Sequence, residues 1–215
     1  MNAPPPSDAV LQVSRLNFSY PDLPLFHDLS AKIAPGVTLV RGGDGRGKTT
    51  LLQLLAGQMP VKDGVLQLDG IRLDEDSEAY RRRVFYVDPR TEAYDQQTPP
   101  EFFAAMRKHF PAFDEARLPA LTEGLSLTPH LEKKLFMLST GSKRKVYLAA
   151  AFAANATLTL LDDPFAGLDR ASINFFIQTL DAQAALPRTG QQAWVLAMYE
   201  PPAGIALAAT IDLGD

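Results

Sequence analysis

Residues 42–50 read GGDGRGKTT and follow the short apolar stretch VTLV. The spacing G-x-x-x-x-G-K-[ST] is typical of a loop whose backbone N–H groups fold around phosphate. Lys48 is expected to reach the β- and γ-phosphates of a nucleotide, and the Thr49 hydroxyl to bind Mg²⁺. The alternative is a glycine turn that caps a helix and exposes a lysine. The loop residues expected to bind nucleotide are Gly42, Gly43, Asp44, Gly45, Arg46, Gly47, Lys48, Thr49 and Thr50.

The pattern on either side of this loop predicts alternating strands and helices. The runs VLQVSRLNF, DLSAKI and GVTLVRG, with turn residues between them, predict N-terminal strands. The segment KTTLLQLLAG predicts a helix that a left-handed glycine ends. A hairpin is expected around Asp69 and Gly70, and RRVFYVDP is expected to be a buried strand that stops at its proline.

The second half of the chain is first helical and then returns to strands. Helical periodicity runs through PPEFFAAMRKHF, FDEARLPALTEGLSL and GSKRKVYLAAAFAA. Strands are expected at LTLLDDP and AWVLAMY, with the helical pattern RASINFFIQTLDAQAAL between them. This alternation favours a mainly parallel α/β core. We predict a disordered lead-in at 1–8 and a single domain at 9–215, with a helical subdomain at approximately 92–150.

An acidic pair ends the apolar run at 158–161, where Asp162 and Asp163 follow LTLL. Ligands of open α/β sheets bind at the carboxyl ends of the strands. Asp162 is therefore expected to hold Mg²⁺ through a water, and Asp163 to face the attacking water. Two aspartates after a strand are by themselves more often a turn or a helix cap. Their pairing with the loop at 42–50 favours the catalytic interpretation.

The order of motifs resembles the ATP-binding cassette (ABC) ATPases, the nucleotide-binding subunits of ABC transporters. Residues 134–169 look like the signature motif, its helix, the acidic strand and the D-loop of that family in unbroken order. The preceding segment HFPAFDEARLPALTEGLSL is similar to the helical subdomain of small ATPases that serve ABC-2-type exporters. The resemblance covers nearly all of 9–215. It implies a P-loop fold with a mainly parallel core sheet, an N-terminal antiparallel β region and a helical subdomain.

The resemblance also implies roles for residues outside the loop. Tyr20 would stack on adenine, with Phe18 as the competing aromatic residue. Ser139 and Gly141 of LSTGS would contact the γ-phosphate of ATP bound to a second subunit, because the family completes each site across a dimer interface. A serine and a glycine at the start of a helix suit this contact, since free N–H groups there favour phosphate.

Three departures from the family pattern affect the hydrolytic positions. Asp163 stands where the family has glutamate, and its shorter side chain would retreat from the attacking water by roughly 1–1.5 Å, a misplacement worth on the order of 100-fold in rate. Tyr199 stands where the family has its switch histidine and stays neutral. Pro89 aligns with the usual glutamine, although Asp88 lies beside it and Gln96 and Gln97 follow. The signature also has Thr140 and Ser142 for the usual glycine and glutamine.

Composition limits the partners and the compartment. The 215 residues carry a formal net charge of −4 and no cysteine, so they present no basic field for nucleic acid and no disulfide or cysteine-ligated zinc. No apolar stretch is long enough to span a bilayer. We expect no nucleic-acid partner and a cytoplasmic protein, peripheral on the inner face of the membrane through a transmembrane transporter subunit.

Two functions are compatible with these residues. The first is a subunit that binds MgATP, dimerises with a second ATP-binding cassette subunit and drives export through a separate membrane protein, with slow hydrolysis. The second is an ATP-dependent switch that regulates a partner without turnover, possible also as the degenerate half of a heterodimer. In a heterodimer, Ser139 and Gly141 would serve the partner's competent site. Cargo specificity would lie in a membrane protein outside this chain.

Overall fold

The computed structural model describes residues 9–184 and 191–214, and the lead-in predicted at 1–8 lies outside these residues. The strands are β1 (Leu11–Tyr20), β2 (Leu23–Ile33), β3 (Gly36–Arg41), β4 (Asp63–Leu68), β5 (Ile71–Arg72), β6 (Val84–Tyr86), β7 (Leu158–Asp162), β8 (Ala193–Ala197) and β9 (Leu207–Asp212). The α-helices are α1 (Lys48–Leu55), α2 (Ser77–Arg81), α3 (Pro99–His109), α4 (Leu118–Gly124), α5 (Thr140–Ala154) and α6 (Arg170–Ala184). Short 3-10 helices are η1 (Glu115–Arg117), η2 (Thr128–His130) and η3 (Leu135–Met137).

A five-stranded parallel sheet forms the centre, in the order β6-β7-β8-β3-β9. Strand β8 is buried along its whole length, and β7 is buried up to its last residue, Asp162. Near-continuous apolar runs are expected of parallel strands that are covered on both faces. The predicted α/β fold with a mainly parallel core sheet is confirmed.

A four-stranded antiparallel sheet, β2-β1-β4-β5, packs beside the parallel one. Its last hairpin pairs Leu68 with Ile71, and Asp69 and Gly70 between them have φ values of 47° and 80°. Two successive left-handed residues are the geometry of a type I′ turn, which matches the twist of the strands. The hairpin predicted from Asp-Gly and the N-terminal antiparallel region are confirmed.

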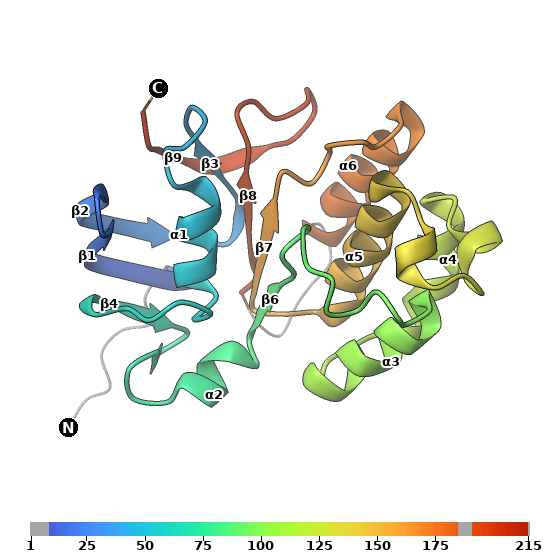
Figure 1. The fold of residues 1–215 in the computed structure, drawn as a ribbon, viewed down its shortest axis with the longest axis horizontal. Coiled ribbons are helices and arrows are strands. Elements are labelled where there is room, and N and C mark those ends of the chain that lie inside the picture. The colour runs from blue at the N-terminus through green and yellow to red at the C-terminus, as the bar shows by residue number, and fades with distance from the viewer. Residues whose placement is uncertain (1–8, 185–190, 215) are drawn as a thin grey trace.

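The two faces of the parallel sheet bury different clusters. Leu51, Leu52, Leu54 and Leu55 of α1 are fully buried between the two sheets. Helices α5 and α6 cover the other face, where Phe152, Phe176 and Trp194 make close ring contacts. In Figure 1, α1 lies between the sheets, α5 and α6 flank β7 and β8, and α3 and α4 lie beyond α5.

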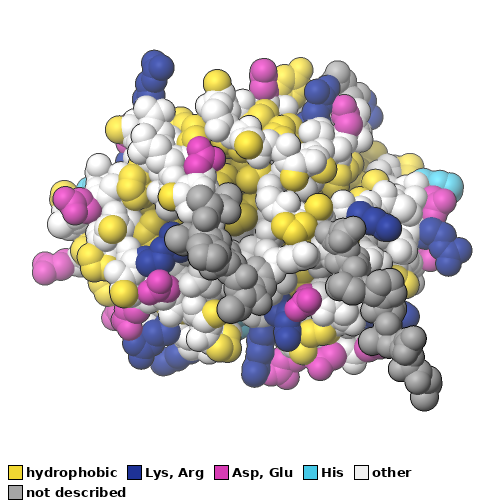
Figure 2. All heavy atoms as spheres, turned by 180° about the vertical axis from the view of Figure 1, so that it is seen from behind, with side chains coloured by type: hydrophobic (Ala, Val, Ile, Leu, Met, Phe, Trp, Pro, Cys, Tyr) yellow, Lys and Arg dark blue, Asp and Glu magenta, His cyan; other side chains and the backbone are white. Residues whose placement is uncertain are grey.

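The surface mixes both signs of charge. On the part of the back face visible in Figure 2, Lys and Arg side chains are interspersed with Asp and Glu side chains around the rim. This distribution agrees with the formal net charge of −4 and gives no single-sign field. Among the described residues, no helix has both the length and the apolar character needed to cross a membrane.

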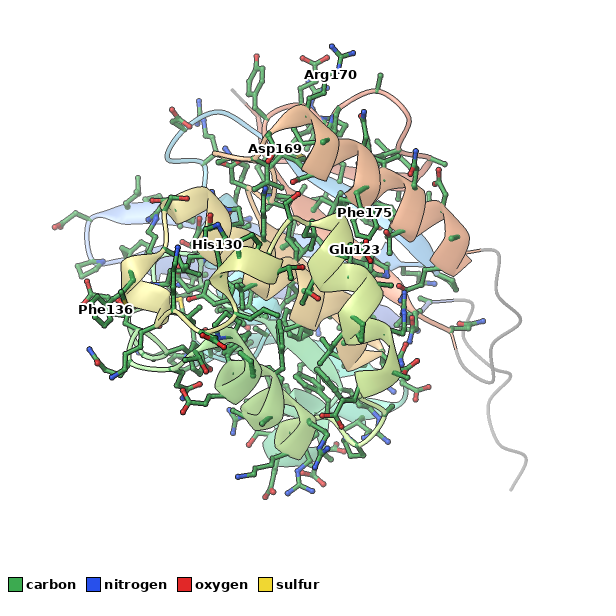
Figure 3. The ribbon with its side chains drawn as sticks, turned by 90° about the vertical axis from the view of Figure 1, so that its right-hand side faces the viewer. Glu123, His130, Phe136, Asp169, Arg170 and Phe175 are labelled. Atoms are coloured by element: carbon green, nitrogen blue, oxygen red, sulfur yellow. The ribbon has the colours of Figure 1, made fainter. Side chains whose placement is uncertain are left out.

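The helical region departs from the expected pattern at one segment. The single helix predicted for FDEARLPALTEGLSL is broken into η1 and α4, because Pro119 occupies the first turn of α4 and starts a new helix there. A Cβ at Gly124 would lie 2.0 Å from Cε2 of Phe175, so α4 ends in close contact with α6, as the neighbouring Glu123 and Phe175 in Figure 3 illustrate. Helix α2 and strand β9 were not predicted.

Candidate nucleotide-binding site

Glycine geometry shapes the loop between β3 and α1. Gly45 and Gly47 have φ values of 76° and 88°, in the left-handed region that favours glycine. Gly47 is also the N-cap of α1, and because glycine has no side chain, no side-chain cap occupies the first N–H groups of the helix. A Cβ at Gly47 would lie 3.0 Å from Cζ of Phe26, which is a second reason for glycine there. The loop thus offers an uncapped helix N-terminus, which favours an anion.

Lys48 lies across the mouth of the loop. Its ammonium group donates hydrogen bonds to the carbonyl oxygens of Gly42 at 2.6 Å and Gly43 at 2.8 Å. From the other side, the Gly43 N–H donates to the carbonyl oxygen of Gly214 at 2.9 Å. The segment after β9 therefore supports the loop through Gly214, and Lys48 places a positive charge beside Gly42 and Gly43.

Thr49 and Asp162 bring α1 and β7 together. The Thr49 hydroxyl donates a hydrogen bond of 2.6 Å to Oδ2 of Asp162. Burial raises the pKa of Asp162, and the Thr49 hydrogen bond and the positive charge of Arg90 oppose that rise. A hydroxyl and a carboxylate are hard oxygen donors, which Mg²⁺ binds together with phosphate oxygens and waters. The chemistry of this pair fits Mg²⁺.

Asp163 and Tyr199 lie at the carboxyl ends of β7 and β8. Asp163 has a φ of 45°, and its N–H donates to the carbonyl oxygen of Ala197 at 2.8 Å. Aspartate tolerates the left-handed region better than most residues. Tyr199 lies just beyond β8 and is 69% exposed. Parallel pairing of β7 with β8 brings both residues to one edge of the sheet.

A cleft of about 500 Å³ gathers most of the predicted residues. Its walls include Tyr20, Lys48, Asp162, Asp163 and Tyr199, which come from separate parts of the sequence. Of the loop, Asp44, Gly45, Gly47, Lys48, Thr49 and Thr50 line it, whereas Gly42, Gly43 and Arg46 do not. A cleft with an uncapped helix N-terminus, a lysine and an acidic pair can hold a polyphosphate and a divalent cation.

Tyr20, the last residue of β1, contributes an aromatic ring to the wall of the cleft. Tyr20 is 41% exposed, and its ring stands edge-on to that of Phe18, with 5.1 Å between the ring centroids. The Tyr20 hydroxyl lies 3.3 Å from Oγ1 of Thr50, which joins the end of β1 to the start of α1. Phe18 does not line the cleft and packs against the buried cluster instead. Of the two aromatic candidates, Tyr20 is placed to face a ligand.

Arg90 lines the same cleft and was not predicted as a site residue. It follows Asp88 and Pro89, just after β6, at the carboxyl edge of the parallel sheet. The sequence contained one signal, a charged residue immediately beyond a predicted buried strand. Leu23, Leu25 and Met198 also line the cleft, and as apolar residues they gave no comparable signal.

Ser139 and Gly141 do not line this cleft. Ser139 is the exposed N-cap of α5, and its Oγ accepts a hydrogen bond of 3.1 Å from the Ser142 N–H. A Cβ at Gly141 would lie 2.2 Å from the carbonyl oxygen of Gly167, so the first turn of α5 packs directly on the loop after β7. Of the predicted signature residues, Ser139 is thus exposed at the N-terminus of α5, whereas Gly141 is buried.

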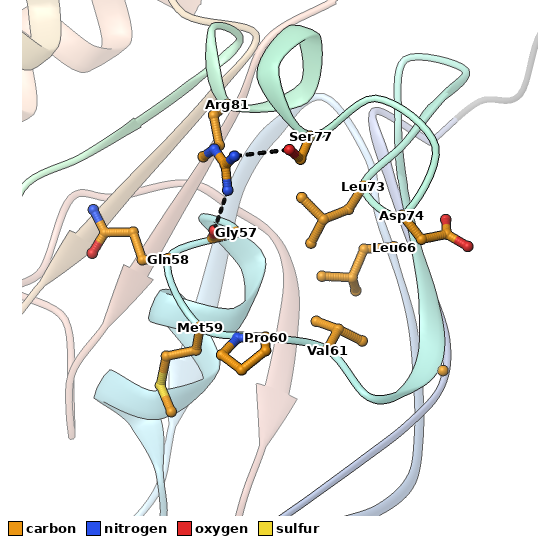
Figure 4. Close-up of a pocket in the computed structure, with 11 residues that line it drawn as sticks. Gly57, Gln58, Met59, Pro60, Val61, Leu66, Leu73, Asp74, Ser77 and Arg81 are labelled. Atoms are coloured by element: carbon orange, nitrogen blue, oxygen red, sulfur yellow. Dashed lines mark hydrogen bonds between the residues drawn. The ribbon is translucent and has the colours of Figure 1, made fainter.

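A further pocket of about 360 Å³ lies at the opposite end of α1 (Figure 4). There Arg81 donates to the carbonyl oxygen of Gly57 at 3.0 Å and to Oγ of Ser77 at 2.8 Å. These bonds tie α2 to the turn that ends α1. The charged residues Arg81 and Asp74 both line this pocket, and each already bonds to protein groups, Asp74 to Arg72.

The geometry and the comparisons with known proteins identify the same class. Residues 26–166 match the family profile described as ABC transporter. The ABC-type transporter ATP-binding protein EcsA of Bacillus subtilis is 28% identical over 177 residues, which are 80% of this chain and 72% of that protein. The cytochrome c biogenesis ATP-binding export protein CcmA of Aromatoleum aromaticum is 32% identical, covering 75% and 77%. The chain belongs to the ABC transporter family.

Other similar proteins agree on the class and differ in direction of transport. The taurine import ATP-binding protein TauB of Pseudomonas fluorescens is 34% identical over 75% of this chain, which spans 62% of that protein. A solved ATP-binding subunit of an ABC transporter superposes with a TM-score of 0.77 at 26% identity, covering 88% of this chain and 79% of that chain. The fold and the family together define a nucleotide-binding subunit.

Proposed function

We propose that this chain binds MgATP in the cleft beside α1 and couples ATP-driven dimerisation, with slow hydrolysis, to export by a separate membrane protein. The observation that carries the proposal is the convergence of Lys48, Thr49, Asp162 and Tyr20 on one cleft. Asp163 and Tyr199 reach the same cleft in the places where the family has glutamate and histidine. Slow turnover is the expected result of those two replacements.

Each residue of the site is assigned the contact that suits its chemistry. Tyr20 would stack on the base, and the loop N–H groups and Lys48 would hold the phosphates. Thr49 and Asp162 would hold Mg²⁺, which when bound neutralises charge on the phosphate oxygens. Asp163 would orient the attacking water, and the Tyr199 hydroxyl would donate toward the terminal phosphate. Ser139 and Gly141 would serve the nucleotide of a second cassette subunit, of the same chain or of another.

The helical segment and the family relationship support a role in export together with a transmembrane partner. Residues 9–215 are proposed to act as one cassette domain, in which approximately 92–150 form the helical subdomain. The segment at 109–127 resembles that of exporter ATPases, and the name of the related CcmA designates an export protein. We place the chain on the cytoplasmic face of a membrane through a transmembrane partner.

Calorimetric titration tests the binding proposal. Wild type should bind MgATP, and Lys48→Ala should weaken binding strongly because a charge is removed from the phosphates while the fold stays intact. Lys62→Ala, an exposed lysine outside the cleft, is the matched control. Equal affinities of wild type and Lys48→Ala would refute the phosphate-loop assignment.

Turnover separates the transport subunit from the second candidate, a non-hydrolysing ATP switch. The altered residues at 163 and 199 are the observation that favours the switch. Steady-state ATP hydrolysis would be measured with the purified protein alone and with a candidate membrane partner. Hydrolysis that the partner stimulates supports the transport subunit, whereas ATP-dependent dimerisation with no turnover in either case supports the switch.

A further inference from the structure

A tight turn in the backbone after β6 holds Arg90 at the cleft. The Arg90 N–H donates a hydrogen bond of 2.9 Å to Oδ1 of Asp88, and the Thr91 N–H donates to the carbonyl oxygen of Asp88 at 3.0 Å. An aspartate that bonds the backbone two residues ahead forms a tight local turn. Oδ2 of Asp88 lies 3.5 Å from Nε2 of Gln53 in α1. The turn after β6 is thereby fastened toward the helix that follows the phosphate loop.

The Arg90 side chain lines the cleft, and its guanidinium group has no bonding partner among the described residues. Among residues 9–184 and 191–214, no hydrogen bond or salt bridge to the guanidinium group was found, whereas the nearby Arg81 and Arg82 both bond to neighbours. Arg90 lines the cleft together with Lys48 and Asp162. A free guanidinium at the rim of a cleft is available to a ligand.

The polar surroundings of Arg90 place it at the metal end of the cleft. Strand β6 pairs in parallel with β7, with Tyr86 opposite Leu160, so the turn that carries Arg90 leaves the sheet beside the end of β7. Arg90 and Asp162 therefore lie at the ends of neighbouring strands, at the carboxyl edge of the parallel sheet. Tyr20, which would hold the base, comes from the end of β1 in the other sheet. Arg90 accordingly faces the end of the cleft where the terminal phosphate of a nucleotide would lie.

We propose that Arg90 binds the terminal phosphate of the nucleotide and supplies a charged contact that neither Pro89 nor the neutral Tyr199 provides. This inference rests on the proposed function of the cleft. The planar guanidinium offers several N–H donors in a fork that matches phosphate oxygens, and it stays charged at any physiological pH. Lys48 provides the other cationic contact, from the loop side of the cleft. The preference for ATP over ADP thus depends on Arg90.

Paired titrations with ADP and with the β,γ-imido analogue of ATP test this assignment. Arg90→Ala should weaken the triphosphate by about tenfold, the scale of one charge-assisted hydrogen bond, and leave ADP affinity within about twofold. Arg90→Lys should retain part of the preference because it keeps the charge but loses the fork. Arg82→Ala removes an exposed arginine that pairs with Glu78 outside the cleft, and it should change neither affinity.

The outcomes distinguish this inference from the function on which it rests. Triphosphate binding that does not depend on Lys48 would refute the proposed function, whatever Arg90 does. Binding that depends on Lys48 together with an unchanged affinity ratio in Arg90→Ala would overturn the inference alone. An equal loss for ADP and the triphosphate would also overturn it, because the contact would then not be to the terminal phosphate. Circular dichroism would verify that each variant is folded.

Discussion

The Thr49 hydroxyl donates a 2.6 Å hydrogen bond to Oδ2 of Asp162, 113 residues further along the chain. The bond joins the first turn of α1 to the carboxyl end of β7. Because a hydroxyl and a carboxylate oxygen both suit Mg²⁺ as ligands, we propose that metal and phosphate would meet at this contact.

Replacing Asp162 tests the metal assignment. In wild type, Mg²⁺ should strengthen ATP binding, and Asp162→Asn should remove most of that enhancement while leaving metal-free binding nearly unchanged. Asp44→Asn changes another carboxylate of the same cleft and should keep the enhancement. Titrations of ATP with Mg²⁺ and with a chelator measure the difference. A full Mg²⁺ effect in Asp162→Asn would exclude this carboxylate as the metal residue.

Two substitutions test the proposal that Asp163 and Tyr199 stand where the family has glutamate and histidine. Asp163→Glu combined with Tyr199→His should raise turnover, by on the order of 100-fold if the position of the carboxylate dominates, with little change in ATP affinity. Asp163→Glu should also lower stability slightly, because glutamate suits the backbone φ of 45° less well than aspartate. Phosphate-release kinetics measure the rate. A wild type faster than the double variant would contradict the assignment.

The contributions of Ser139 and Asp163 to ATPase activity can be compared in a complex with a partner subunit. If Ser139 serves the partner's nucleotide, Ser139→Arg should abolish the ATPase activity of a heterodimer, whereas Asp163→Asn should change it little. A homodimer should lose activity with either change, because each of its equal sites needs both residues. Silencing by Asp163→Asn with Ser139→Arg tolerated would place hydrolysis at this chain's own loop and contradict the heterodimer.

Gly141 should be intolerant of any side chain. Gly141→Ala would put a Cβ 2.2 Å from the carbonyl oxygen of Gly167, so the loop after β7 would have to move. We expect a loss of about 1–3 kcal/mol in the free energy of unfolding, the usual cost of overpacking. Thr140→Ala, at the exposed neighbouring position, should stay within about 0.5 kcal/mol. Urea unfolding of both variants checks the contrast.

The stability of the loop before α6 should depend on pH in the acid range. Lys145 Nζ lies 2.5 Å from Oδ2 of Asp169, and this hydrogen bond, with that of the Ser172 N–H, holds the pKa of Asp169 well below its ordinary value of 3.8. Figure 3 shows Asp169 next to Arg170, the first residue of α6. A depressed folded pKa means that the pair stabilises the protein fully above the ordinary value. The contribution is lost as the pH falls through the folded value.

Asp169→Asn isolates the charge, because asparagine can still accept the capping bond from Ser172. The variant should be less stable than wild type at neutral pH, and the difference should shrink below about pH 4. The effect should be modest, since the Asp169 side chain is 57% exposed and solvent screens the pair. Urea midpoints measured across this range provide the comparison. A difference that grows toward low pH would contradict the sign.

Local sequence determined the elements of this protein and the chemistry of most of its site. The loop at 42–50, the hairpin at Asp69 and Gly70 and the strand that ends in Asp162 were all predictable, because each depends on the conformational preferences of a few adjacent residues. The family could be inferred in the same way, since its motifs appear in a fixed order along the chain.

Tertiary structure alone decided which of these elements meet. Strand β9 has a mostly exposed pattern with no strong apolar signal, and only its pairing with β3 reveals that it supports the phosphate loop. Arg90 follows a three-residue strand, and it becomes a cleft residue because β6 pairs in parallel with β7. The register between distant strands depends on packing over the whole sheet rather than on neighbours in sequence, and for that reason the residues of the cleft could be predicted singly but not as a set.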